Sequence, residues 1–456
     1  MANKAARTRW GGIADGRVRP NGYFRIARQD RIFWLVDPDG GRFLSKGINS
    51  VTVEQDRIQN SDHIPYAQAC KGKYRSLNAW RESTIGRISR WGFNTLGAWS
   101  DETLATAGSL PFALTPILDL GMSYAWRHNE QNSSRGKQEF PDVFERAFGY
   151  HVRSHARDLC ESRSTDPTIL GWFIDNELRW GSDWRGDDEL LVLFLNLDPQ
   201  SAGRSAAFAL LRKRYRDFAE FNSVWRTPAQ SWDGLEGLNR LDAPYRRKPI
   251  YQHPVADLSP DRADPGFATF AADCDAFAAL VAKCYFRLTA AAIKAADPNH
   301  LILGCRFAYK PSPGVIGAAG RYCDVISFNC YDPDPSGVMD AYAAAERPCL
   351  IGEFSFRGID SGLPNTKGVG PLVATQAERA TGFKHYVTAA LRHPTVVGYH
   401  WFEYVDQPAA GRFDGENSNF GTVTIEDEVY EELTQAMASV NAETEDLHAT
   451  APHTFA

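Results

Sequence analysis

The sequence predicts an α/β fold of the (β/α)8 TIM barrel class, with a short N-terminal β-hairpin and a long insertion after the fourth barrel strand. Two observations lead to this prediction. Eight short apolar runs follow one another along the 456-residue chain, most of them separated by segments of helical pattern, as in a parallel α/β sheet. Two of these runs, at 169–177 and 348–354, deliver acidic side chains to a strand end, which is where barrel active sites lie.

The first segment, residues 1–41, is expected to be an N-terminal extension carrying the hairpin. Two short apolar stretches at 23–28 and 32–36 flank a polar break. Asp, Pro and Gly then fill residues 37–41, a composition typical of a turn. We expect this hairpin to plug or flank the barrel.

The catalytic barrel is expected to span residues 42–440. Its eight strands are predicted at 42–49, 93–99, 113–120, 169–177, 301–307, 324–331, 348–354 and 396–404. Helices are predicted at 78–91, 140–160, 267–296 and 374–391. The connection after 301–307 is short and rich in Gly and Pro, so its helix is expected to be weak. The polar tail at 441–456 is expected to be loose.

The insertion at 178–264 follows the fourth strand directly, so we expect it on the active-site face. It carries four tryptophans: Trp180, Trp184, Trp225 and Trp232. A second long loop, 357–371, follows the seventh strand. These two long loops lie beside the two strand ends that carry acidic residues. We therefore expect them to close the substrate cleft at one end, which favours cleavage at the ends of a substrate chain.

Composition excludes several classes of partner. Lys and Arg number 50 against 56 Asp and Glu, giving a net charge of −6, whereas nucleic-acid and anionic-membrane surfaces need a basic excess. No run of 18 apolar residues predicts a membrane span. We therefore expect neither a nucleic-acid nor a membrane partner, and the sequence carries no signal for oligomeric state.

The predicted location is cytoplasmic. The eight cysteines form no CxxC pair, as expected for buried thiols in a reducing compartment. The first ten residues lack the apolar region of a signal peptide. The prediction changes to periplasmic or secreted if a leader was trimmed from the chain.

Glu177 and Glu353 are the candidate catalytic residues. Cleavage of a glycosidic bond uses one carboxylic acid to protonate the leaving oxygen and one carboxylate to attack or to activate water. The alternative interpretation is that neither glutamate is catalytic and that each strand ends in a charged residue because it reaches solvent there. No His-x-His motif and no Gly-rich phosphate loop occur in the sequence, so no metal or cofactor is expected.

Several stretches match a known family. They are Asp37-Pro38-Asp39-Gly40 leading into Ser45-Lys46-Gly47-Ile48-Asn49, Gly171-Trp172-Phe173-Ile174-Asp175-Asn176-Glu177, Asp297-Pro298-Asn299-His300, Ile351-Gly352-Glu353-Phe354, His400-Trp401-Phe402-Glu403-Tyr404 and 411–417. On these motifs the chain resembles clan A retaining glycoside hydrolases. It looks most like the β-agarase family, whose founding members act on chain ends, and less like the β-galactosidases of the clan.

The resemblance implies a hydrolase for β-linked oligo- or polysaccharides of the agarose or galactan type. It implies that Glu177 is the acid/base and Glu353 the nucleophile. It also implies that Asn176 bonds the sugar 2-hydroxyl, that Tyr331 holds the nucleophile, and that Trp401 floors the first sugar subsite. Agarases of this family carry a β-sandwich carbohydrate-binding domain ahead of the barrel, whereas residues 1–41 precede the first strand here.

Four further residues are candidates for substrate binding: Asn49, Asn329, His400 and Glu416. Each has a structural alternative, such as a rim histidine or a solvated acidic loop after the last strand, and Asn176 could equally be a strand cap. The rival functions are a barrel that binds carbohydrate without cleaving it, a clan A hydrolase for a β-glucoside or another sugar without galactose, and a metal-dependent hydrolase.

Overall fold

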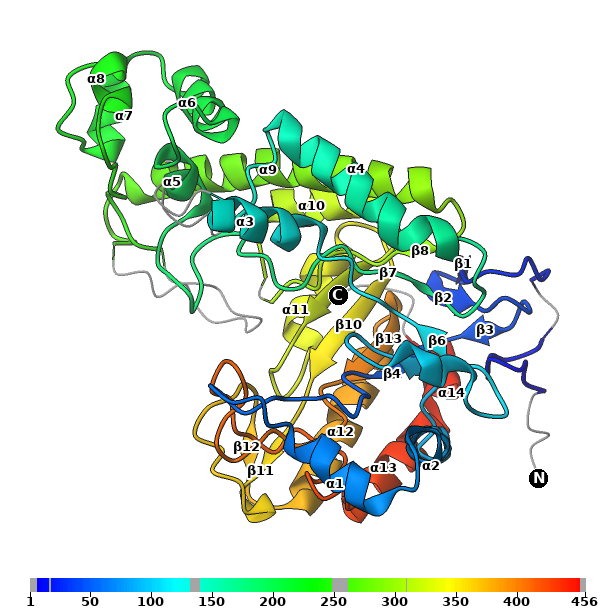
Figure 1. Ribbon diagram of the computed structural model, residues 1–456. Coiled ribbons are helices and arrows are strands. Elements are labelled where there is room, and N and C mark those ends of the chain that lie inside the picture. Colours follow the sequence, from blue (N-terminus) through cyan, green and yellow to red (C-terminus); the bar gives the residue numbers. More distant parts are fainter. Residues whose placement is uncertain (1–5, 16–17, 132–139, 248–260, 309, 452–456) are drawn as a thin grey trace.

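The computed structural model describes residues 6–15, 18–131, 140–247, 261–308 and 310–451 (Figure 1). Its centre is a six-stranded sheet in the order β6–β5–β4–β13–β10–β9, in which every neighbouring pair is parallel. These strands are β4 (Ser45–Ile48), β5 (Thr95–Leu96), β6 (Ala113–Leu114), β9 (Ile326–Asn329), β10 (Cys349–Phe354) and β13 (Val396–Trp401). The protein is therefore a mixed α/β fold built on a parallel sheet.

Two further parallel strands, β7 (Gly171–Trp172) and β8 (Leu301–Ile302), pair with each other. Single parallel bridges join this pair to the ends of the larger sheet. Leu114 and Ile117 bridge to Ile169 and Phe173 beside β7, and Phe307 bridges to Phe328 in β9. The predicted strand regions thus all lie in parallel pairings, in chain order.

Most of the ladders are shorter than predicted, because the chain leaves the extended conformation early. Residues with positive φ follow five of the strands: Ser50 (58°), Trp99 (60°), Asp119 (51°), Glu177 (54°) and Arg306 (48°). The left-handed conformation cannot continue a β-ladder. These residues therefore end the strands and turn the following chain at one edge of the sheet.

The N-terminal hairpin consists of β1 (Arg25–Gln29) and β2 (Ile32–Val36), which pair antiparallel as predicted. Strand β3 (Arg42–Phe43) extends this sheet. The apolar side chains Phe24, Phe33 and Leu35 share a buried cluster with Leu170, Leu303 and Val325 near the starts of the parallel strands. The hairpin therefore packs against the end of the sheet opposite to Glu177.

Helices cover the sheet on the outside (Figure 1). The predicted helices are α2 (Leu77–Arg90), α4 (Arg146–Cys160), α9 (Phe267–Ala296) and α12 (Gln376–Leu391). Thr375 caps α12 by accepting from the Glu378 amide, as in a capping box. The helix expected to be weak is a regular one, α10 (Pro313–Tyr322), because its apolar face packs on α9.

Four helices between residues 42 and 441, outside the insertion, were not predicted. They are α1 (Pro65–Lys73), α3 (Leu120–Gln131), α11 (Ser336–Ala343) and α13 (Glu431–Asn441), with the short 3-10 turns η1 (Glu102–Thr106), η2 (Glu161–Arg163) and η3 (Ile359–Ser361). A small parallel pair, β11 (Arg357–Gly358) with β12 (Leu372–Val373), lies in the loop after β10.

The insertion forms a separate helical lobe that projects beyond one end of α9 in Figure 1. It contains α5 (Leu190–Leu195), α6 (Ala202–Arg214), α7 (Phe218–Trp225) and α8 (Trp232–Glu236), while residues 248–260 lie outside the described part of the chain. Trp180 and Trp225 are buried, and Trp232 packs on Phe221. Of the four tryptophans only Trp184 is exposed. Trp225 and Trp232 pack inside the lobe, whereas Trp180 packs on Phe286 of α9.

The prediction of a loose C-terminal tail is wrong for the described residues up to 451. Residues Thr444–Ala449 form helix α14. Glu445 is buried and pairs with Lys46 of β4 at 2.8 Å. The ring of His448 lies between the backbone carbonyls of Phe33 and Leu391, at 2.9 Å from each. These contacts fix a segment whose polar composition alone indicates disorder.

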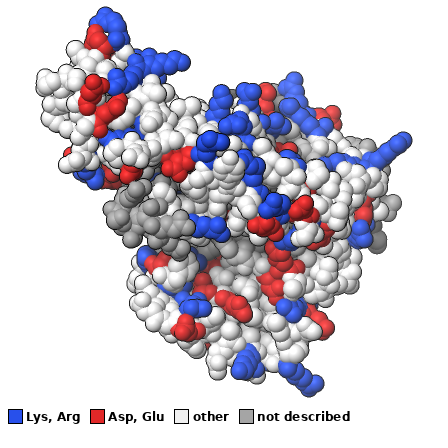
Figure 2. Space-filling view, turned by 45° about the horizontal axis from the view of Figure 1, so that its top comes forward, with Lys and Arg blue, Asp and Glu red and all other residues white. Residues whose placement is uncertain are grey.

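Acidic and basic side chains are intermingled on the face of the molecule shown in Figure 2. Among the described residues, one helix, α9, is long and apolar enough to cross a membrane by length and composition. Its most apolar window is 56% buried inside the protein, as is typical of a core helix.

Candidate active site

The two candidate glutamates lie at the same edge of the parallel sheet. Glu353 is in β10, and its neighbour Asn329 ends β9, with which it is paired in register. Glu177 follows β7, and its backbone amide bonds the carbonyls of Cys305 and Arg306 beyond β8. The carboxyl ends of parallel strands meet at one edge, and this edge collects the predicted catalytic side chains.

Glu353 is held from both sides. One carboxylate oxygen accepts a hydrogen bond from Arg306 Nη2 at 2.5 Å, and the other accepts from the Tyr331 hydroxyl at 2.7 Å. The side chain is only 5% exposed. The two donors thus satisfy both carboxylate oxygens and fix their orientation. Burial raises the pKa of Tyr331 well above its usual value, and the Glu353 carboxylate adds to this, so the Tyr331 hydroxyl remains a donor.

Glu177 has the opposite environment. Burial raises the pKa of its carboxyl to about 7, and the neighbouring charge of Glu353 adds to this, while a hydrogen bond from Asn329 works against it. That bond, from Asn329 Nδ2 to Oε1, is 2.7 Å long. The Arg185 guanidinium binds the backbone carbonyl of Glu177 at 2.8 Å. Glu177 is therefore a group that can hold or release a proton near neutral pH.

Arg306 connects the two carboxyl groups, and the sequence analysis missed it. Its Nε donates to Asn176 Oδ1 at 2.8 Å, and Asn176 also lies 3.4 Å from Asn329 Nδ2. A side-chain network thus runs from Glu353 through Arg306, Asn176 and Asn329 to Glu177. One signal could have identified this residue: Arg306 is a lone charge near the end of the apolar run 301–307, the same pattern that identified Glu353.

Glycine at position 352 makes this network possible. A Cβ there would lie 2.7 Å from Asn329 Oδ1 and 3.1 Å from Arg306 Nη1. Distances this short are steric clashes with side chains that are already fixed by hydrogen bonds. The backbone beside Glu353 must therefore lack a side chain for Arg306 and Asn329 to converge.

Trp401 does not lie where the resemblance implied. It is 0% exposed, its indole nitrogen donates to the Phe420 carbonyl at 3.0 Å, and its ring packs on Phe354 and on Phe383 of α12. Successive side chains of a strand point to opposite faces, and Trp401 points towards the helix layer. The prediction that Trp401 floors a sugar subsite is therefore wrong.

His400 and Asn49 are also buried structural residues in this fold. The His400 ring accepts or donates a hydrogen bond with Ser45 at 2.9 Å, and burial next to Arg306 lowers its pKa to about 3. Asn49 donates to the carbonyls of Gly352 and Trp401 and accepts from the Ala98 amide. Both residues are completely buried and contact the strands beneath the site.

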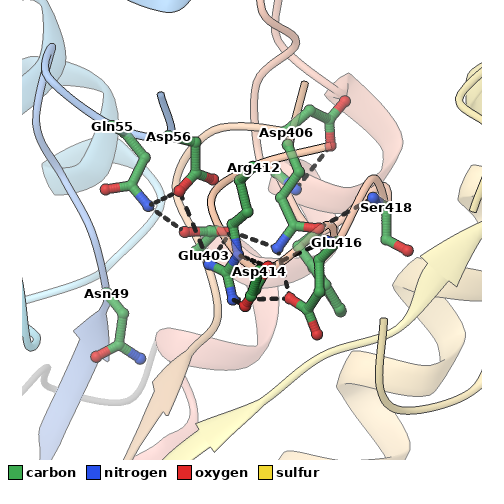
Figure 3. Close-up of polar contacts among 12 residues, drawn as sticks. Asn49, Gln55, Asp56, Glu403, Asp406, Arg412, Asp414, Glu416 and Ser418 are labelled. Atoms are coloured by element: carbon green, nitrogen blue, oxygen red, sulfur yellow. Dashed lines mark hydrogen bonds and ion pairs between the residues drawn. The ribbon is translucent and has the colours of Figure 1, made fainter. Parts of the chain in front are cut away.

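Glu416 belongs to a polar cluster on the loop after β13 (Figure 3). Its carboxylate accepts from Arg412 at 2.7 Å and from Gln407 at 2.9 Å. The fully buried Glu403 accepts from Gln55 at 2.7 Å, and burial next to Asp56 raises its pKa well above the usual value. Arg412 also stacks on the ring of Phe402, whose centroid lies 6.3 Å from that of Tyr331, so this cluster lies beside the site. Among the described residues, no group of three or more His, Cys, Asp or Glu could hold a metal ion.

The comparisons with known proteins agree with the β-agarase motifs of the sequence. No family model matches the chain. Two curated relatives come from Vibrio sp. (strain JT0107). Beta-agarase A is 31% identical over 477 residues, covering 89% of this chain and 44% of its own length. Beta-agarase B is 27% identical over 503 residues, covering 95% of this chain and 50% of its own length.

This chain is a homologue of β-agarases. It spans about half the length of the curated relatives it matches. The solved structure of an exo-β-agarase superposes with a TM-score of 0.77 at 24% identity, covering 97% of this chain and 68% of that one, which shows a shared fold. A β-galactosidase from the haloarchaeon Halorubrum lacusprofundi superposes less well, with a TM-score of 0.51 at 16% identity over 79% of this chain and 55% of that one.

Proposed function

We propose that this protein is a retaining glycoside hydrolase that cleaves β-linked, galactose-containing oligo- or polysaccharides of the agarose type. The observation that carries the proposal is a pair of glutamates in one hydrogen-bonded network with opposite electrostatic environments. Glu353 is paired with a guanidinium, whereas the pKa of Glu177 is raised to about 7. A carboxyl group that can hold a proton near neutral pH, beside a carboxylate bound by a guanidinium, supports the roles of acid and nucleophile.

In the first step Glu353 attacks the anomeric carbon while Glu177 donates its proton to the leaving oxygen. The bond to the leaving sugar breaks and a glycosyl ester forms on Glu353. In the second step Glu177, now a carboxylate, takes a proton from water, which attacks the anomeric carbon and releases Glu353. Arg306 and Tyr331 hold the nucleophile's two oxygens in place for attack and for departure.

The proposal includes a closed (β/α)8 barrel. The bridges from Leu114 and Ile117 to the β7 region, and from Phe307 to β9, support closure of the six-stranded sheet through β7 and β8. In a closed barrel of this kind, loops after the strands surround one active site. Glu177, Arg306 and Glu353 would then come from the fourth, fifth and seventh strands.

The substrate and the exo mode rest on homology and on the loop after β10. The relatives are β-agarases, and the exo-β-agarase structure has the same fold. Arg357 bonds the Gly370 carbonyl at 2.9 Å, and a Cβ at Gly370 would lie 3.2 Å from the Tyr331 ring. This loop is therefore fixed against a side chain that binds the nucleophile, which supports a cleft closed on that side and attack at chain ends.

The proposal is tested with agarose-derived oligosaccharides and the variant Glu353→Ala. We expect turnover by the natural chain with initial release of the β anomer, observed by NMR of fresh product. Glu353→Ala should abolish turnover, and azide should restore it on an activated substrate with inversion to an α-glycosyl azide. An initial α anomer, or near-normal activity of Glu353→Ala, would contradict the mechanism. A panel including β-glucosides tests the sugar, and binding without any hydrolysis would instead indicate a carbohydrate-binding barrel.

A further inference from the structure

Asp175 is a buried acidic residue behind the catalytic edge of the sheet. It follows β7 and precedes Glu177 by two positions. The residue is 0% exposed, so it has no surface that a substrate could contact. Within the described part of the chain, its hydrogen bonds go to residues of two helices. A buried carboxyl group with partners of its own, this close to the proposed acid, indicates a role distinct from substrate binding.

The carboxyl group of Asp175 joins the chain after β7 to α3 and α9. Its two oxygens accept hydrogen bonds from backbone amides in the first turn of α3, from that of Gly121 at 2.8 Å and from that of Met122 at 2.9 Å. The hydroxyl of Tyr285 on α9 donates to the same carboxyl group. The first amides of a helix have no partner within the helix. Asp175 therefore satisfies two donors that α3 itself leaves unpaired.

These bonds to α3 do not depend on the charge of Asp175. Burial raises the pKa of its carboxyl to about 7, and the nearby charge of Asp119 adds to this, while the hydrogen bonds from Tyr285 and Met122 work against it. A protonated carboxyl group keeps acceptor capacity for amide donors. The anchor to α3 is therefore present on both sides of neutral pH.

The chain between Asp175 and Glu177 is held in an unfavourable conformation. Glu177 has a φ of +54°, in the left-handed region that a residue with a long side chain rarely adopts. Such a conformation persists only where the surrounding structure imposes it. On one side, the Glu177 amide bonds the Arg306 carbonyl at 3.3 Å. On the other side, Asp175 packs closely on α3, since a Cβ on Gly121 would lie 2.9 Å from its Oδ2 and 3.1 Å from the Tyr285 ring.

We propose that Asp175 is a positioning residue for the acid/base Glu177. Its anchor on α3 and α9 holds the turn that sets the Glu177 backbone, and so directs the Glu177 carboxyl towards the leaving oxygen. The inference rests on the proposed hydrolase function and adds to it a residue that does not touch the substrate. Loss of the anchor should impair proton donation and leave nucleophilic attack and substrate binding intact.

The test compares two substrates that differ in their need for an acid. An agarose-derived oligosaccharide has a leaving oxygen that must be protonated, whereas the dinitrophenyl β-glycoside of the same released sugar unit has a leaving group that departs without a proton. We expect Asp175→Asn to lower kcat/KM for the oligosaccharide about tenfold, through kcat and not KM, as part of the roughly 10²–10⁴-fold contribution of a positioned general acid. For the dinitrophenyl glycoside, kcat/KM should change less than about twofold.

Tyr285→Phe is a milder variant, which removes one donor to Asp175 and keeps the two amides. It should lower kcat/KM for the oligosaccharide about threefold with the same selectivity, and it tests the inference even if Asp175→Asn does not fold. Tyr215→Phe is the matched control. The Tyr215 hydroxyl also donates to a buried aspartate on α9, Asp273, at 2.5 Å, but this pair joins α9 to the insertion lobe, so neither substrate should respond.

Thermal midpoints establish that each variant is folded. Equal losses on the two substrates would overturn the inference, because they would show a general loss of folded enzyme. Unchanged oligosaccharide kcat/KM in folded Asp175→Asn, or a loss carried by KM, would overturn it as well. With both substrates hydrolysed by the natural chain, these results leave the proposed function intact, whereas a natural chain that hydrolyses neither substrate refutes the proposed function and this inference together.

Discussion

The negative charge of Glu353 should have a measurable effect on the pKa of Glu177. The variant Glu353→Gln keeps the shape of the nucleophile and removes its negative charge. Because that charge raises the pKa of Glu177 after burial does, its removal should lower this pKa below its value of about 7. Burial remains in the variant, so the pKa should stay above the ordinary value for glutamate.

The size of the change follows from Coulomb's law. In a retaining hydrolase the two carboxyl groups are about 5–5.5 Å apart. At an effective dielectric constant of about 20, two unit charges at this distance interact by roughly 3 kcal/mol, or about 2 pKa units. This value is an upper bound, since burial is the larger contribution to the shift. We therefore expect a decrease of about one unit.

The measurement is a pH titration of carboxyl-labelled glutamate by NMR or infrared difference spectroscopy. Glu177→Gln identifies the signal by its disappearance. Glu426→Gln, on an exposed loop, is the control and should leave the titration of Glu177 unchanged. A pKa of Glu177 that stays the same or rises in Glu353→Gln would refute the coupling of the two carboxyl groups.

Three other predictions concern pH, the core and the network. Because the folded-state pKa of Glu177 is raised to about 7, its proton is lost above that pH, and kcat/KM for unactivated oligosaccharides should fall there; a flat alkaline profile would contradict the acid role. Glu445→Gln leaves the Lys46 ammonium buried without its partner, so urea melts should show a loss of about 3–5 kcal/mol, and a loss below about 1 kcal/mol would mean that water reaches this lysine. Gly352→Ala places a Cβ 2.7 Å from Asn329 and should lower kcat at least about tenfold with little change in KM, whereas unchanged kcat would show that the network tolerates displacement.

The sequence was most informative where polar residues end an apolar run, three of them at 175–177 and one at Glu353. This pattern identified Glu177 and Glu353, and the structure joins both to one network through Arg306 and Asn329. A strand whose side chains are all apolar on both faces is recognisable without knowledge of its neighbours. The order of the strands followed from the same signal.

The sequence could not predict which face of a strand each side chain occupies. His400 and Trp401 are adjacent residues of β13, and a shift of one position exchanges the inner and outer face. Buried strands show no alternation of polar and apolar residues, so the sequence contains no signal to choose between the two. The left-handed residues that end the strands, Trp99 and Arg306 among them, are equally hidden, because neither residue type favours that conformation.

The pairing of Lys46 with Glu445 also bears on the order in which the protein can be made. The two residues are 399 positions apart in the chain. At a translation rate of 5–20 residues per second, the ribosome needs roughly 20–80 s to add the partner after Lys46 has been synthesised. During that interval the ammonium group of Lys46 in β4 lacks the carboxylate that it pairs with in the folded protein. The first strand of the parallel sheet therefore cannot complete this ion pair until Glu445 has been synthesised.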